Sequence, residues 1–324
     1  MSTAPAEIRT QDIAHDERQD YLWTLNFGPQ HPATHTTLRI VMKLDGERVV
    51  DAMPDIGYLH SGFEKIGESL DYNQYVTVTD RMNYISPAAN NIAWHGAVER
   101  LLGIELTPRC KYLRTIIAEL QRISDHLLCN GAVGLDAGAF TFFLYAFNKR
   151  EDIYDIMETL CGARFTHSYT RTGGLSQDFT PLVVEKIRTF VKTFPKVLDD
   201  MERLLNRNRI FVDRTKGVGI LTRDEALSRS VTGPIARASG VTRDLRKDEP
   251  YLAYADFDFQ VPCMKQGDCF ARYLVRQAEM RESLKIIAQA IENVPAGPVN
   301  VGIDQRTALP NKRIVSIADR LLGR

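Results

Sequence analysis

Apolar and polar residues alternate near the amino terminus of the chain. Between Thr36 and Leu44 every second residue from Leu38 onward is apolar, which is the period of a strand with one buried face. Asp45-Gly46 follows, and the short run RVVDAM comes soon after it. This pattern predicts a two-stranded antiparallel hairpin.

The period of the apolar positions changes after Pro54. In KYLRTIIAELQRISDHLL, residues 111–128, apolar side chains recur three or four positions apart and share one helical face. The residues on this face are Leu113, Ile116, Ile117, Leu120, Ile123 and Leu127. Similar patterns predict helices over residues 90–102, 147–160, 182–205 and 271–291, with a kink or break at Pro195.

Residues 214–262 lack this regularity and are rich in glycine, proline and small polar residues. They predict long loops with short strands that cover the helices. The fold class is therefore α+β, with a small N-terminal antiparallel β-sheet followed by a large helical bundle. We divide the chain into a flexible arm (1–22), a sheet region (23–56), a helical core (57–310) and a divergent tail (311–324).

Composition excludes several classes of protein. Lysine plus arginine equals aspartate plus glutamate, at 41 each in 324 residues, so charge gives no reason to expect a nucleic-acid partner. The five cysteines include no C-x-x-C pair, which argues against a disulfide scaffold or a self-contained metal site. The polar opening residues lack the basic-then-apolar profile of an export signal, so we expect none. The apolar run 132–147 is interrupted by Asp136 and is shorter than the roughly 18 residues of a spanning helix.

Two of the seven histidines, His31 and His35, lie in the turn before the first predicted strand. Pro29 and Pro32 prevent a regular helix there, and four extended residues span about 13 Å, so a two-histidine metal site is disfavoured. One alternative is structural, with one imidazole capping the hairpin and the other packing at its edge. The other is that an imidazole at a pocket mouth donates a hydrogen bond or a proton.

Four further segments combine chemically active side chains with glycine or proline. For each one alone, a structural role as a loop, a cap or a half-buried side chain is the simpler explanation. The residues are His60, Glu64 and Lys65 in GYLHSGFEK, Arg81 and Tyr84 in TDRMNYISP, Asp136 in GLDAGAF, and Arg164, His167 and Arg171 in GARFTHSYTRTGG.

Taken together and in order, these segments resemble one family. GPQHPATH, IGYLHSGFEK, RMNYISP, AVERLLGIELTPR, LDAGAFTFFLYAF, GARFTHSYTRTGG, GVGIL, ARASGVTRDLRK and MRESLKII are similar to segments of the quinone-site subunit of proton-pumping NADH:quinone oxidoreductase. This complex is respiratory complex I, and in bacteria this subunit is known by the letter D. The resemblance runs from about residue 23 to about residue 301.

The resemblance implies a fold like that of nickel-iron hydrogenase large subunits, whose metal-binding cysteine pairs the family has lost. A hydrogenase-like metalloenzyme is a disfavoured alternative, because nickel and iron need such thiolates. The resemblance implies instead a cavity that faces an iron-sulfur cluster of a partner subunit and that quinone enters through a membrane subunit. We expect NADH, FMN and the clusters to bind to partner subunits only, no metal in this chain, and a peripheral location on the cytoplasmic side of the inner membrane.

The resemblance also implies roles for individual residues. His35 and Tyr84 are expected to hydrogen-bond the two sides of the quinone headgroup, and Asp136 to pair with His35. Converting a quinone to a quinol takes two electrons and two protons, so donors are needed against its carbonyl oxygens. His31 is expected to be structural. A second group of residues is expected to join a charge network toward the membrane partners: His60, Glu64 and Lys65.

Arg81, Arg164 and His167 are expected near the partner's cluster, where positive charge favours its reduction. The family has a histidine where this chain has Thr166, with His167 one position later, so the proton-linked tuning of the cluster is open here. Thr36 also replaces a family glycine. Beyond residue 310 the motifs stop, and we expect a chain shorter at its carboxy terminus than its relatives. The alternative function is therefore a truncated, non-catalytic or purely structural subunit.

Overall fold

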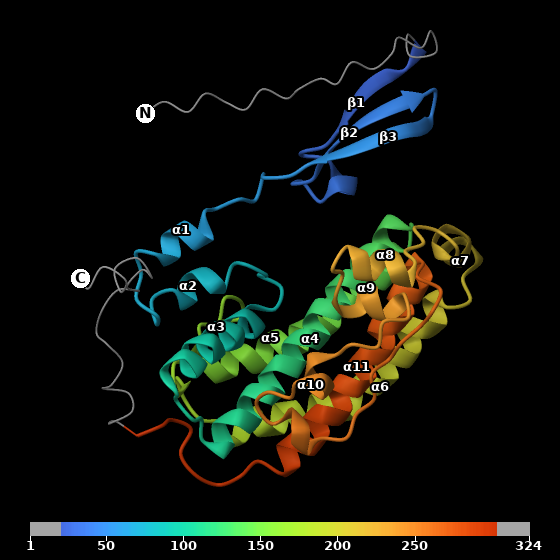
Figure 1. Ribbon diagram of the computed structural model, residues 1–324. Helices are drawn as coiled ribbons and strands as arrows, with labels where there is room; N and C mark the ends of the chain where they lie inside the picture. Colours follow the sequence, from blue (N-terminus) through green and yellow to red (C-terminus); the bar gives the residue numbers. More distant parts are fainter. Residues whose placement is uncertain (1–20, 303–324) are drawn as a thin grey trace, which may run out of the picture. The chain divides into compact units, whose positions relative to one another are not determined.

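A computed structural model describes residues 21–302, which form two compact units that meet in sequence at Gly62 and Phe63 (Figure 1). The predicted tail, 311–324, and all but two residues of the predicted arm, 1–22, lie outside the described residues. Each unit is described by itself below.

The N-terminal unit contains a three-stranded antiparallel sheet in the order β1-β2-β3. Its strands are β1 (Trp23–Phe27), β2 (Arg39–Asp45) and β3 (Arg48–Asp55). Asp45 pairs with Arg48 across the turn, and Gly46 takes a positive φ of 60° there, as a tight hairpin turn requires. The predicted hairpin is thus confirmed, and β1 adds a third strand on the other side of β2.

The second unit is mostly helical. Its elements are α1 (Phe63–Gly67), α2 (Val76–Thr79), α3 (Pro87–Leu102), α4 (Pro108–Asp136), α5 (Phe140–Cys161), β4 (Thr170–Arg171), β5 (Gly174–Leu175), α6 (Pro181–Leu205), α7 (Arg209–Thr215), α8 (Arg223–Ser228), α9 (Gly233–Ala238), α10 (Leu245–Asp248), the short 3₁₀ turn η3 (Tyr254–Asp256) and α11 (Cys269–Glu292).

Helix α4 is the centre of this unit and packs against α3, α5 and α11, while α6 packs against α5 and α11 (Figure 1). It begins where the side chain of Thr107 accepts a hydrogen bond from the backbone N–H of Cys110, with Pro108 in the first turn. The apolar face predicted from the sequence is fully buried. The α+β fold class is confirmed.

Two details of the prediction are wrong. Helix α6 has no break at Pro195 and continues through it, because buried Phe194 and Leu198 anchor the helix on both sides of the proline. Residues 214–262 form long loops as predicted, but these loops carry short helices, and no strand is described among them. One of these, α8, begins with a capping box between Thr222 and Glu225, a signal that the sequence already carries.

Among the helices of residues 21–302, none is both long enough and apolar enough to span a bilayer.

Candidate functional site

His31 and His35 flank a short 3₁₀ turn, η2 (Pro32–Thr34), in the N-terminal unit. Nδ1 of His31 accepts a hydrogen bond from the backbone N–H of Ala33 at 3.1 Å, and its ring lies 4.7 Å from that of Phe27. These contacts give His31 a structural role. His35 ends the turn with a positive φ of 51°, which is uncommon for a residue other than glycine, and its side chain is exposed.

Asp136 is the last residue of α4 and is exposed. A carboxylate is unfavourable at a helix C-terminus, because the helix dipole is negative there. Nη1 of Arg214 donates to the carbonyl oxygen of Ala137 at 2.9 Å, which brings positive charge to this helix end.

Tyr84 lies in the turn between α2 and α3, and its side chain is 46% exposed. Its ring meets that of Phe165 edge-on at 6.3 Å, and Phe165 in turn contacts Tyr154 of α5 at 6.2 Å. The guanidinium of Arg164 lies 5.9 Å from the ring of Tyr154. The fold thus brings together two of the predicted site segments, the turn around Tyr84 and the loop after α5.

Arg81 and Arg164, the two arginines expected near the partner's cluster, are exposed. Nη1 of Arg81 donates to the carbonyl oxygen of Thr77. Arg164 forms an ion pair with Glu151, and this hydrogen bond raises the pKa of the guanidinium. An exposed ion pair of this kind contributes little to stability. The pair with Glu151 therefore does not make Arg164 necessary for the stability of the fold.

His167 differs from the two arginines because it is buried. Its Nε2 lies 3.2 Å from the carbonyl oxygen of Arg164, and within the described residues its Nδ1 has no hydrogen-bond partner. Burial lowers the pKa of His167, which favours the neutral ring. Thr166, at the position where the family has a histidine, has a positive φ of 53°.

The residues of the expected charge network are exposed in both units. His60 belongs to the N-terminal unit, and α1 of the helical unit carries Glu64 and Lys65. Nζ of Lys65 forms an ion pair with Glu68 at 2.6 Å.

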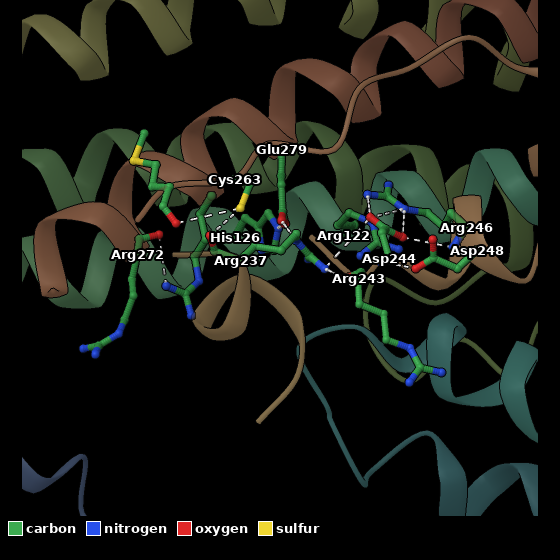
Figure 2. Close-up of polar contacts among 12 residues, drawn as sticks. Arg122, His126, Arg237, Arg243, Asp244, Arg246, Asp248, Cys263, Arg272 and Glu279 are labelled. Atoms are coloured by element: carbon green, nitrogen blue, oxygen red, sulfur yellow. Dashed lines mark hydrogen bonds and ion pairs between the residues drawn. The ribbon is translucent and has the colours of Figure 1, made fainter. Parts of the chain in front are cut away.

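A group of charged side chains that the sequence did not predict is buried inside the helical unit (Figure 2). Glu119 of α4 accepts hydrogen bonds from two side-chain hydroxyls, those of Tyr254 and Ser283, each at 2.6 Å. Arg246 and Arg122 contact the same carboxylate at 3.1 and 3.2 Å. Burial alone would raise the pKa of Glu119, but these two arginines lower it to about 2.

A second buried carboxylate, Glu279 of α11, binds residues from α4 and α9 (Figure 2). Its Oε2 lies 2.7 Å from Nε2 of His126, and its Oε1 accepts from Nε of Arg237 at 2.5 Å. Burial alone would raise the pKa of Glu279, but the hydrogen bond from His126 and the charge of Arg237 lower it to about 2. Asp244 connects the two groups, at 2.7 Å from Arg246 and 4.0 Å from Arg237.

Two cavities, of about 640 and 900 Å³, border this network, and Arg122 lines both. A single sequence does not distinguish such buried charges from charges on a solvated helix face, because most of the partners of Glu119 and Glu279 are more than 100 positions away. Two pairs of the network are local in sequence, Glu119 with Arg122 and Asp244 with Arg246.

Comparisons with known proteins agree with the motifs. A family model described as respiratory-chain NADH dehydrogenase, 49 Kd subunit, matches residues 136–321, more than half of the chain. The match includes residues 311–321, which lie beyond the last of the motifs and in the tail that was predicted to be divergent. The chain belongs to this family.

Curated relatives carry matching names. The chain is 51% identical to the second of the D subunits of NADH-quinone oxidoreductase in Cytophaga hutchinsonii, over 87% of this chain and 72% of the relative. It is 50% identical to the D subunit of the same enzyme in Akkermansia muciniphila, over 90% and 70% of the two chains. The family prediction is confirmed, and with it the prediction that the chain is a subunit of an enzyme complex, NADH-quinone oxidoreductase, whose other subunits are its partners.

The fold also occurs in a solved respiratory complex. A chain from the structure of the membrane-bound sulfane sulfur reductase, an archaeal respiratory membrane complex, matches with a TM-score of 0.86 and 34% identity. The match covers 90% of this chain and 78% of that one. Respiratory complexes with different names thus share this fold. The fold alone therefore does not identify the substrate, which has to be inferred from the site residues.

Proposed function

We propose that this subunit forms the site at which a proton-translocating NADH-quinone oxidoreductase reduces quinone, next to an iron-sulfur cluster carried by a partner subunit. The observation that carries the proposal is the contact between the rings of Tyr84 and Phe165. It joins the RMNY turn to the GARFTH loop, two segments about eighty positions apart that bear the donors and cations expected of such a site. Family membership supports the same conclusion.

Reduction of a quinone to a quinol requires two proton donors next to the headgroup, which gains two electrons. The exposed phenol of Tyr84 is a neutral donor for one carbonyl oxygen, and the imidazole of His35 is the donor for the other. Asp136 is proposed to orient that imidazole and to balance its charge when it is protonated.

The exposed guanidinium groups of Arg81 and Arg164 fit a negatively charged cluster on a neighbouring subunit. They stand in the two segments that the ring contact joins, so electrons would arrive beside the phenol that supplies a proton. His167 is buried and bonded within its own loop, and we assign it a supporting position. His60, Glu64 and Lys65 are proposed to join the charge network toward the membrane partners. The cluster supplies the electrons, and NADH and FMN are proposed to bind to other subunits.

We further propose that the chain is a peripheral subunit on the cytoplasmic side of the membrane. Its specific partners would be the subunit with the terminal iron-sulfur cluster and the membrane subunit through which quinone enters.

Replacing Tyr84 by phenylalanine in the assembled complex tests the proposal. We expect Tyr84→Phe to reduce NADH:quinone activity sharply, because the donor is lost, and to leave NADH oxidation by ferricyanide intact. Tyr251→Phe, at a tyrosine that is 41% exposed, is the matched control and should behave like the wild type. Undiminished quinone reduction by Tyr84→Phe would refute the site. Co-purification with partner subunits separates the proposal from the alternative of a non-catalytic fragment.

A further inference from the structure

Asp80 is a carboxylate buried directly before the turn that carries Arg81 and Tyr84. Its side chain is 1% exposed, and in the part of the chain that the structure describes it takes part in no ion pair. A buried carboxylate is costly unless hydrogen bonds stabilise it. The position therefore needs an explanation beyond packing.

The hydrogen bonds of Asp80 lead to the second site segment. The hydroxyl of Ser168 donates to Oδ2, and the backbone N–H of Ser168 donates to Oδ1 at 3.4 Å. Oδ1 also accepts from Nδ2 of Asn91 at 2.5 Å. Asn91 is itself buried on α3 and accepts from the hydroxyl of Thr79 at 2.6 Å. The carboxylate thus connects the end of α2, helix α3 and the loop after α5.

The loop that Asp80 holds has an unfavourable backbone. Thr166 and Ser168 have positive φ values of 53° and 40°, and such conformations persist only where the surroundings hold them in place. The carbonyl oxygen of Ser168 accepts a hydrogen bond from Nη1 of Arg171. Ser168 is therefore held on both its side chain and its main chain.

We propose that Asp80 is a positioning residue for quinone reduction, and that it holds the Tyr84 turn against the Arg164 loop through Ser168. This inference rests on the proposed function. The buried contact between Asp80 and Ser168 holds the two segments together. The rings of Tyr84 and Phe165 therefore meet at the surface. Neither Asp80 nor Ser168 is proposed to touch quinone.

The test uses the assembled complex with Asp80→Ala, Ser168→Ala and the double variant, and measures kcat and KM for quinone. Each single variant should lower kcat/KM by about 10- to 100-fold, because small misplacements of a reacting group are costly. The double variant should be no less active than Asp80→Ala alone, because both substitutions break the same contact between Asp80 and Ser168. Asp80→Asn keeps an oxygen that accepts from Ser168 and should recover part of the activity. Ferricyanide reduction should stay at the wild-type level.

Asp268→Asn is the matched control. Asp268 is also a buried aspartate, and it accepts from the backbone N–H groups of Gly217 and Ala271 at the start of α11. It should cost stability without changing kcat or KM.

Wild-type kcat and KM per assembled complex for Ser168→Ala, or effects of the two substitutions that simply add, would overturn the proposal. If the complex with Asp80→Ala fails to assemble, Ser168→Ala still tests the proposal, because this substitution removes a single hydroxyl. Tyr84→Phe separates the two claims. If it is inactive while Ser168→Ala is normal, only the role of Asp80 is refuted, and if it is fully active, the quinone site itself is refuted.

Discussion

Nε2 of His126 lies 2.7 Å from Oε2 of Glu279, and the two residues are 153 positions apart in the sequence. Both side chains are buried between α4 and α11. Because the other oxygen of Glu279 accepts from Arg237 of α9, this one carboxylate joins three helices (Figure 2).

Glu279→Gln should destabilise the purified chain strongly. The substitution removes the nearer of the two carboxylates that pair with the buried guanidinium of Arg237, and breaking a buried ion pair on one side costs about 3–5 kcal/mol. The measurement is the free energy of unfolding in urea at pH 7. Glu292→Gln is the control on the same helix, because Glu292 pairs with Arg188 at 2.8 Å but both are exposed, and solvent screens an exposed pair so that it contributes little to stability. Equal effects of the two variants would contradict the buried network.

His95 should make the folded chain less stable in mild acid. Its Nδ1 lies 2.8 Å from the hydroxyl of Thr170, and burial together with the charges of Arg114 and Arg171 lowers the pKa of His95 to about 3. The unfolded chain takes up this proton below about pH 6.5 and the folded chain does not. Stability is therefore lost as pH falls below 6.5, by about 1.4 kcal/mol per pH unit for this one group.

Urea unfolding at pH 7 and pH 5 measures this effect. His95→Gln has no such titration, so the difference in unfolding free energy between the two pH values should be smaller than in the wild type. An identical difference in both proteins would show that His95 is protonated in the folded state.

Gly174→Ala should destabilise the chain, whereas Gly96→Ala should stabilise it. A Cβ atom at Gly174 would lie 1.9 Å from Oδ1 and 2.9 Å from Cα of Asn300, so main chain must move, at about 1–3 kcal/mol. A Cβ at Gly96 of α3 meets nothing within 4 Å, and alanine is favoured over glycine inside a helix by about 0.5–1 kcal/mol. Thermal unfolding of the two variants should shift in opposite directions, and a gain in stability for Gly174→Ala would contradict the packing of Asn300 against β5.

Local sequence patterns were enough to predict most of the secondary structure. The alternation after Thr36 predicted β2 and its hairpin with β3, and the spacing of apolar residues in 111–128 predicted the middle of α4. The pattern could not show that α6 passes Pro195, because that depends on buried neighbours on both sides. The composition of residues 214–262 predicts loops with strands, and it does not reveal the helices there, because α8, α9 and α10 are only 6, 6 and 4 residues long and too short to show an apolar period.

The candidate site divides in the same way. The sequence by itself determined the family and singled out His35, Tyr84 and Asp136, because motifs of several residues are local and specific. Only the tertiary structure decided that the Tyr84 turn meets the loop of Arg164, and that Asp80, Glu119 and Glu279 are buried. A carboxylate in a sequence looks the same on a surface and in a core, since what stabilises it in the core is a donor that the fold brings from a distant part of the chain.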